Sequence, residues 1–352
     1  MSDTNTPRSK AIDYTPLAQP VSLRDVREYK RQVRTTEDKN AFLGERIALG
    51  IFIVVAGLTW AVVALVVSLH GTGTAAPTIV IAAIWSLILL GVAAALQGQY
   101  KRTVRVTRFA AANDLGFRKL RKDHQPIGMI FGIGTQREQH NVISSKDGAF
   151  EFGEHRYTTG TGKYRRVHYW NYLRIRLDRA LPHMVLDATA NNVGFGPLRL
   201  SNLPVPFDRD QVLSLEGDFD KYFTLYAPRD YERDALYIFA PDLMALFVDH
   251  GAAFDAEIVD NNLFIYSKKA KLDDPRYLAQ LFAIIDKVGQ KTSQRSERYQ
   301  DERAAAADVA ARQVAEPGRR LKRSVSLVAI IIVILLVLFQ VLPSIIQLFT
   351  DR

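Results

Sequence analysis

Hydrophobic residues are gathered into three long uncharged runs, two in the first hundred residues and one at the end of the chain. The runs cover residues 47–69, 78–97 and 325–349. A helix rises about 1.5 Å per residue, so runs of this length match a hydrocarbon core that is about 30 Å thick. Each run is therefore predicted to be a transmembrane helix, joined in the first pair by a short loop at residues 70–77.

The placement of basic residues predicts an orientation for these helices. Residues 1–46 carry nine Lys and Arg residues and the loop at 70–77 carries none. The positive-inside rule then predicts that the N-terminus and the region between the second and third runs are cytoplasmic, with the loop and the C-terminus outside a bacterial inner (plasma) membrane. Basic residues beside the runs are expected to contact anionic lipid of the inner leaflet. These residues are Lys101, Arg102, Arg105, Arg108, Arg319, Arg320, Lys322 and Arg323.

None of the three runs contains Asp, Glu, Lys or Arg. Channels and ion-coupled transporters usually place ionisable groups at membrane depth, so the runs are typical of anchors. Gly57 with Ala61 and Gly91 with Ala95 would allow close helix packing and self-association through the spans, or they reflect ordinary composition. Both interpretations stay open.

Residues 1–46 are predicted to be a cytoplasmic tail followed by a juxtamembrane helix. Residues 1–20 are polar with three prolines and are expected to be disordered. Ser22 followed by Asp25 is typical of a helix start, and residues 23–33 would form a basic amphipathic helix. Such a helix either lies on anionic headgroups or is a solvated connector.

The region 103–290 is predicted to be a cytoplasmic α+β domain, in which a mostly antiparallel sheet is packed with helices. A basic helix is expected at 103–122, and polar residues 291–323 are expected to form a helical stalk. Period-two alternation predicts strands in between. The expected strands are 129–134, 149–157, 169–179, 183–188, 223–226 and 235–239, with a hairpin over 255–267 and helices at 241–249 and from 274.

Composition excludes several kinds of chemistry. The chain has no cysteine, so disulfides and thiol catalysis are excluded. The histidines are scattered without a metal-binding spacing, and no cofactor motif is found. Glu216, Asp218 and Asp220 are weak candidates for a Ca²⁺ or Mg²⁺ site, and a solvated strand edge is the favoured interpretation. No cofactor and no nucleic acid are expected.

Charge is divided unevenly inside the domain. Residues 101–183 carry 17 Lys and Arg against 7 Asp and Glu, whereas residues 207–262 carry 4 against 13. The basic half follows the membrane helices directly. It is therefore expected to face anionic lipid, although a dipolar surface without a specific partner has the same pattern.

Two stretches carry a resemblance to known proteins. The segment LEGDFDKYFTLYAPRDYERDALYIFAPDLMALFVDHG and the following FDAEIVDNNLFIYS resemble bacterial multi-span membrane proteins with a cytoplasmic α+β domain of unknown function. The resemblance covers about residues 45–300. It implies two N-terminal spans, a cytoplasmic domain and in some members a C-terminal span, and it implies no catalytic residue.

These observations favour an interaction or regulatory protein, similar to a scaffold, that is anchored in the membrane and binds a protein partner. The alternative is a membrane-tethered enzyme that acts through the carboxylates at 216–220. The lack of a catalytic motif favours the first hypothesis.

Overall fold

The structure is a computed structural model that describes residues 11–36, 43–70, 72–122, 124–192, 200–268, 270–305 and 313–323. The chain divides into two compact units. The first comprises Met1–Lys122, Glu138–Asp147 and Ala270–Leu278. The second comprises Asp123–Arg137, Gly148–Lys269 and Ala279–Arg352. Together they form an α+β protein with an antiparallel sheet.

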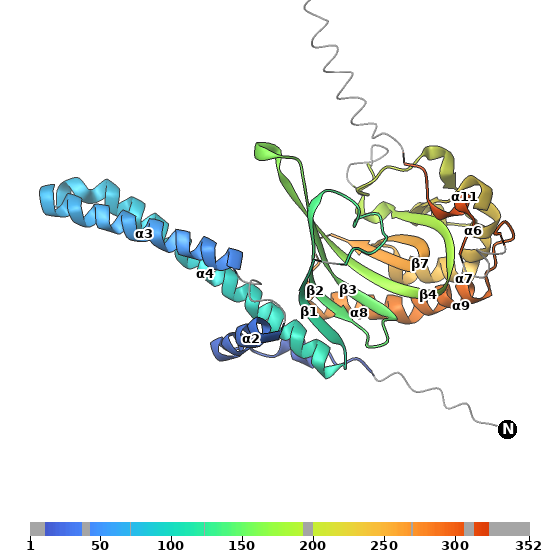
Figure 1. Ribbon diagram of the computed structural model, residues 1–352, viewed down its shortest axis with the longest axis horizontal. Helices are drawn as coiled ribbons and strands as arrows, with labels where there is room; N and C mark the ends of the chain where they lie inside the picture. Colours follow the sequence, from blue (N-terminus) through green and yellow to red (C-terminus); the bar gives the residue numbers. More distant parts are fainter. Residues whose placement is uncertain are drawn as a thin grey trace, which may run out of the picture. The chain divides into compact units, whose positions relative to one another are not determined.

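Two long apolar helices dominate the first unit. Helix α3 (Leu43–His70) and helix α4 (Thr72–Ala112) run side by side (Figure 1). They contain the segments Leu49–Leu69 and Ile79–Ala112, which are long and apolar enough to cross a membrane. Their large side chains are exposed, including Leu65 at 57% and Leu87 at 68%. Because water disfavours so much exposed apolar surface, the pair is suited to a lipid environment.

The two helices contact each other through polar and aromatic side chains at mid-length. Trp60 donates its indole N–H to the Ser86 hydroxyl at 2.9 Å, and Phe52 lies against Trp85. The predicted third span, residues 325–349, lies outside the described residues. The structure therefore shows two candidate membrane helices of the three that we predicted.

The polypeptide around these helices differs from prediction in three places. Helix α4 begins at Thr72, so most of the predicted loop at 70–77 is helical. The helix predicted at 103–122 ends at Ala112, because Asp114 adopts a left-handed conformation (φ 58°) and strand β1 (Gly116–Arg121) follows. Residues 11–20 are ordered against α4.

That N-terminal segment is held by specific contacts. Helix α1 (Thr15–Ala18) places Leu17 almost fully inside the unit, and Tyr14 stacks on Phe109. The backbone N–H of Asp13 donates to the Asn113 side chain at 2.7 Å. The predicted disorder is therefore wrong for this part of the tail, because Tyr14 and Leu17 supply apolar contacts that its polar composition hides.

The second unit is built around one unusually long strand. Strand β4 (Arg166–Ala188) pairs antiparallel with β3 (Phe150–Thr159) and, near its end, with β6 (Phe223–Tyr226). Strand β7 (Asp255–Ser267) pairs with β4 along its other edge, and the short β5 (Val212–Leu213) pairs with β6. The β3–β4 turn contains Gly160 and Gly162, both with positive φ.

Helices cover one face of this sheet. Helices α6 (Glu232–Ile238), α7 (Pro241–Leu246) and α9 (Gln290–Arg298) gather on one side of the strands (Figure 1). Phe282, at the end of helix α8 (Pro275–Ala283), packs edge-on against Phe150 and Phe152. A π-helical turn at Ile284–Gly289 joins α8 to α9. The long helix predicted from residue 274 is thus confirmed.

The opposite face is covered by chain without long helices. Phe131, from the segment before β2 (Thr135–Ser144), lies against Tyr172 and Phe264 of the sheet. Val205, Phe207 and Leu321 are buried in the same cluster. Here the backbone is irregular, so polar side chains must satisfy its donors and acceptors.

Several predicted strands are wrong. Residues 129–134 form turns, and strand β2 begins after them at Thr135. Residues 139–144 of β2 pair with β1. Residues 235–238 belong to helix α6, and Phe239 follows its end. The hairpin predicted over 255–267 is one continuous strand, in which Asp260 (φ 51°) marks an irregularity in the pairing with β4. Residues 183–188 continue β4 instead of forming a separate strand.

The predicted stalk at 291–323 is part of the folded unit where it is described. Residues 290–298 are helix α9, and Asp301 and Val314 are buried. The chain then passes through helix α11 (Glu316–Arg319) and makes an isolated β-bridge between Arg323 and Phe207.

Candidate functional site

The juxtamembrane helix predicted from residue 22 is present and packs on α4. Helix α2 (Leu23–Thr36) begins with a reciprocal cap, in which the Ser22 N–H donates to Asp25 and the Asp25 N–H donates to Ser22 Oγ. Its buried face contacts Tyr100 and Val104. This face consists of Val26, Tyr29 and Val33.

An amphipathic groove lies between α2, α3 and α4, with a volume of about 290 Å³. Apolar side chains form most of its lining, and Arg27 and Lys30 bring positive charge to it. The Lys30 ammonium sits 3.5 Å from the centre of the Tyr100 ring. The remaining lining residues are Leu23, Val26, Leu49, Ala93, Leu96 and Gln97. The groove therefore combines the two features that bind a lipid, an apolar body and a cationic end.

Four of the predicted lipid-contacting cations lie along α4. Arg105 and Arg102 approach the Asp273 carboxylate at 3.5 and 4.0 Å, and Arg108 pairs with Asp25 at 3.0 Å. Lys101 is half-buried. Arg27 and Lys30 line the groove, and these four cations of α4 do not.

The other four predicted cations lie in the second unit. Arg320 forms a two-pronged pair with Asp260 at 2.8 and 3.0 Å. Arg319 pairs with Glu316 at 3.4 Å and donates to the Val314 carbonyl. The Lys322 backbone exchanges hydrogen bonds with the Gln211 side chain, and Arg323 forms the bridge to Phe207. These residues help to fix the chain between residues 313 and 323.

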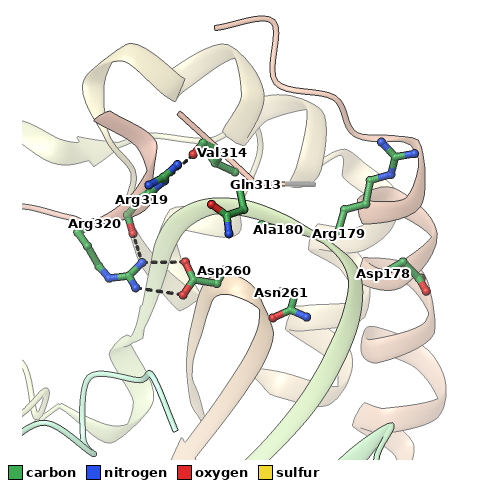
Figure 2. Close-up of a pocket in the computed structure, with 9 residues that line it drawn as sticks. All are labelled: Asp178, Arg179, Ala180, Asp260, Asn261, Gln313, Val314, Arg319 and Arg320. Atoms are coloured by element: carbon green, nitrogen blue, oxygen red, sulfur yellow. Dashed lines mark hydrogen bonds and ion pairs between the residues drawn. The ribbon is translucent and has the colours of Figure 1, made fainter. Parts of the chain in front are cut away.

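An open polar cavity of about 530 Å³ adjoins this segment (Figure 2). The Arg320–Asp260 pair forms one side, and Asp178 and Arg179 of β4 lie across the opening (Figure 2). Gln313 and Asn261 also line it. The cavity could hold a polar ligand, but its best-placed cation is already neutralised by Asp260.

The carboxylates at 216–220 lie before and within the short helix α5 (Phe219–Tyr222). Asp220 accepts hydrogen bonds from the Leu215 N–H and the Ser214 hydroxyl, and Asp218 pairs with Lys221 at 2.7 Å. Glu216 is exposed. Among the described residues, no group of three or more His, Cys, Asp or Glu side chains is arranged to hold a metal ion.

A row of buried polar side chains runs along the irregularly covered face of the sheet, and the sequence did not reveal it. Glu257 of β7 accepts hydrogen bonds from the Met129 N–H at 2.7 Å and the Tyr266 hydroxyl at 2.6 Å. Its other oxygen lies 2.9 Å from His183 Nε2. His183 Nδ1 accepts from the Leu321 N–H, so the imidazole proton is on Nε2 and points to Glu257.

Two further carboxyls lie at the end of this row. Asp187 of β4 and Asp255 of β7 are 3% and 0% exposed. Burial raises the pKa of Asp187 to about 6, against the opposing effect of hydrogen bonds from Ser201 and Asn192. Burial also raises the pKa of Asp255 to about 7, and the nearby Asp187 adds to that shift.

Asp255 is anchored through one oxygen. Its Oδ1 accepts from the Ala188 N–H and from the Asn191 amide, both at 3.0 Å. Several buried oxygens around it have no hydrogen-bond partner. They are Asp255 Oδ2, Asp187 Oδ1, Asn191 Oδ1 and Asn202 Oδ1.

Comparisons with known proteins add little to this geometry. No protein-family model and no curated protein sequence matches the chain. Among solved structures, the crystal structure of the mycobacterial trehalose monomycolate transport factor A, TtfA, aligns with a TM-score of 0.34 and 12% identity. The alignment covers 54% of this chain and 92% of that chain. A likeness of this size carries no argument about fold or activity.

Proposed function

We propose that the protein is a membrane-anchored interaction or regulatory module whose α+β domain is held at the cytoplasmic face of a bacterial inner membrane. The groove lined by Arg27 and Lys30 is the observation that carries the proposal, because it lies beside the apolar segments of α3 and α4. In this proposal an anionic lipid headgroup binds at the groove, and the domain recruits a protein partner.

The position of the groove along the helices supports a headgroup contact. It includes Leu49, at the start of the apolar segment of α3, and Gln97, at the end of the apolar run 78–97 of α4. A bilayer that surrounds the apolar segments would place its polar boundary at this level. Cations near an anionic membrane surface gain about 1 kcal/mol each, so Arg27 and Lys30 together would contribute about 2 kcal/mol.

The orientation in this proposal follows from charge. Nine basic residues precede the apolar segment of α3 and none lies in residues 70–77, so the positive-inside rule assigns the basic side to the cytoplasm. A third span at residues 325–349 would then bring the C-terminus outside. This topology makes the α+β domain accessible to cytoplasmic partners.

Lipid binding is tested with the full chain purified in mild detergent. Native mass spectrometry would compare retained phosphatidylglycerol with retained phosphatidylcholine in the wild type and in Arg27→Gln/Lys30→Gln. We expect the double variant to lose about 2 kcal/mol of preference, which is about thirtyfold in affinity.

A matched variant separates the groove from general charge. Arg24→Gln/Arg31→Gln removes two charges from the same helix outside the groove and should keep the preference. Equal loss in both variants would show that α2 attracts lipid by net charge alone. An unchanged preference in the groove variant would refute the assignment of this site.

Topology is tested by cysteine labelling, which is clean because the chain has no cysteine. Ala76→Cys, in the first turns of α4, should react with an impermeant maleimide added to intact spheroplasts. Thr161→Cys, in the β3–β4 turn, should react only after lysis. The reverse pattern would place the domain outside and would contradict the proposal.

A further inference from the structure

We propose that Asp187 and Asp255, with the side-chain carbonyl oxygens of Asn191 and Asn202, form a binding site for Ca²⁺ inside the second unit. The inference is independent of the proposed function, because it concerns a buried site and not the membrane groove.

Strand register brings the two carboxylates together. Leu186 of β4 pairs with Ala256 of β7 in an antiparallel ladder, so the next residues along, Asp187 and Asp255, stand opposite each other on one face. The Ala188 N–H donates to Asp255 at 3.0 Å, which confirms that the carboxylate reaches across to β4. Like charges placed opposite each other in a ladder are unfavourable unless something compensates them.

The two amide side chains enter from the connection that follows β4. Asn191 ends the 3-10 turn Thr189–Asn191, and its amide nitrogen is fixed by Asp255 Oδ1. The Asn202 side chain hydrogen-bonds to the Asp255 carboxyl, and its backbone N–H donates to Asn192 Oδ1 at 3.0 Å. Both carboxamides therefore lie beside Asp255.

The unpartnered oxygens point to a missing ligand. Four oxygens, one from each of the four residues, are buried and have no hydrogen-bond donor. Buried oxygens are almost always paired, so four on residues that neighbour Asp255 require an explanation. Glu257, two residues from Asp255 on the same strand, has donors at both oxygens, which shows that the same face satisfies a buried carboxylate elsewhere.

The donor set selects the kind of cation. All four atoms are oxygens, which suits hard cations and not zinc or copper, whose sites use nitrogen or sulfur. Ca²⁺ accepts six to eight oxygens in irregular geometry, including amide and backbone carbonyls, whereas Mg²⁺ keeps several waters. Because these oxygens are shielded from solvent and come from three separate segments, Ca²⁺ fits better.

Electrostatics agrees with this geometry. Burial raises the pKa of both carboxyls and so disfavours their charged forms, and repulsion from Asp187 adds to this effect at Asp255. A divalent cation would remove the repulsion and let both carboxylates ionise. The competing explanation is a neutral pair that shares a proton, with no ion bound.

Terbium luminescence distinguishes these explanations in the full chain after chelator treatment. Tyr226 of β6 is near the site, because it pairs with Val185, two residues before Asp187. Its phenol can therefore sensitise bound Tb³⁺. We expect tyrosine-sensitised emission that Ca²⁺ displaces at concentrations of about 1 mM or lower, with Mg²⁺ much less effective. Ca²⁺ should also raise the unfolding temperature of the wild type.

Two variants complete the test. Asp255→Asn should weaken Ca²⁺ binding about tenfold or more and abolish the rise in unfolding temperature. Asp218→Asn, an exposed carboxylate of the second unit, should behave as the wild type.

The proposal is overturned if Ca²⁺ neither displaces Tb³⁺ from the wild type nor raises its unfolding temperature, which would indicate the proton-sharing pair. It is also overturned if Asp255→Asn responds to Ca²⁺ like the wild type. If that variant does not fold, the two wild-type measurements decide alone.

Discussion

Replacing Glu257 by Gln probes a group of hydrogen bonds that holds the segments around Met129 and Leu321 against strands β4 and β7. Glu257 accepts hydrogen bonds from Met129, Tyr266 and His183, and the last of these receives the Leu321 N–H on its other nitrogen. Glutamine has the same shape but replaces one oxygen by an NH₂ group. Whichever way the amide turns, its NH₂ faces at least one donor.

The size of the effect follows from this conflict. If the NH₂ faces His183, the imidazole must move its proton to Nδ1, where it would meet the Leu321 N–H. One donor therefore stays unpaired in either tautomer. A hydrogen bond to a charged group contributes about 1.5–3 kcal/mol, and an unsatisfied buried donor costs about 1–3 kcal/mol. We expect Glu257→Gln to lower the free energy of unfolding by about 3–5 kcal/mol.

Thermal unfolding of the full chain in detergent measures this loss. In a unit of this size 1 kcal/mol corresponds to about 2–4 °C, so the midpoint should fall by about 10 °C. Glu232→Gln makes the same change at an exposed position of α6 and should alter stability by less than about 0.5 kcal/mol. A Glu257→Gln midpoint within 2 °C of the wild type would refute the reasoning about donors.

Three further predictions concern other elements. Gly318→Ala would place a Cβ 2.5 Å from Tyr231 Cζ and should destabilise the second unit by about 1–3 kcal/mol in thermal unfolding, with Gly132→Ala, which has open space, as the control. Lys291, then Arg295, lowers the pKa of Asp242 to about 2, so its stabilising effect is complete above about pH 4 and is lost as the pH falls toward 2. Asp242→Asn should therefore destabilise by less than about 1 kcal/mol at neutral pH, and this effect should shrink in acid-unfolding curves as the pH falls from 4 through 2. Ser22→Ala removes a cap and should increase hydrogen exchange in the first turn of α2, while exchange in β4 stays unchanged.

The elements that the sequence predicted well are those with strong local signals. Residues 47–69 and 78–97 are uniformly apolar, and the Ser22 to Asp25 cap has a fixed spacing, so each could be recognised without tertiary contacts. The β3–β4 turn was predictable because Gly160 and Gly162 supply positive φ.

Tertiary contacts decided the elements that were predicted wrongly. The residue types at 260–262 (Asp-Asn-Asn) are typical of a turn. However, β4 pairs with the chain on both sides of them, and the strand continues through an irregularity at Asp260. Residues 235–239 are a short apolar run that we predicted as a strand, but residues 235–238 lie in helix α6, where Ala235 and Ile238 are buried. Short apolar runs fit either structure by pattern alone.

The buried site was beyond the reach of sequence reasoning for a different reason. Asp187 and Asp255 are far apart in the chain, and each looks like a polar residue at the boundary of a strand. Only the register between β4 and β7 brings them together. The same is true of His183 and Glu257, whose partners come from three segments.

Helix α4 has a mechanical consequence. Helix α4 continues without interruption past Gln97, the last residue of the apolar run 78–97, and ends at Ala112. It therefore extends about 20 Å beyond this run. Helix α2 and the groove are attached to this extension. The helix is continuous between its apolar run and the end that carries α2. A change in the tilt of α4, such as one caused by a thinner bilayer, would therefore move α2 as well. In a membrane that surrounds the apolar segments, a change in bilayer thickness would therefore displace the end of α4 that carries α2.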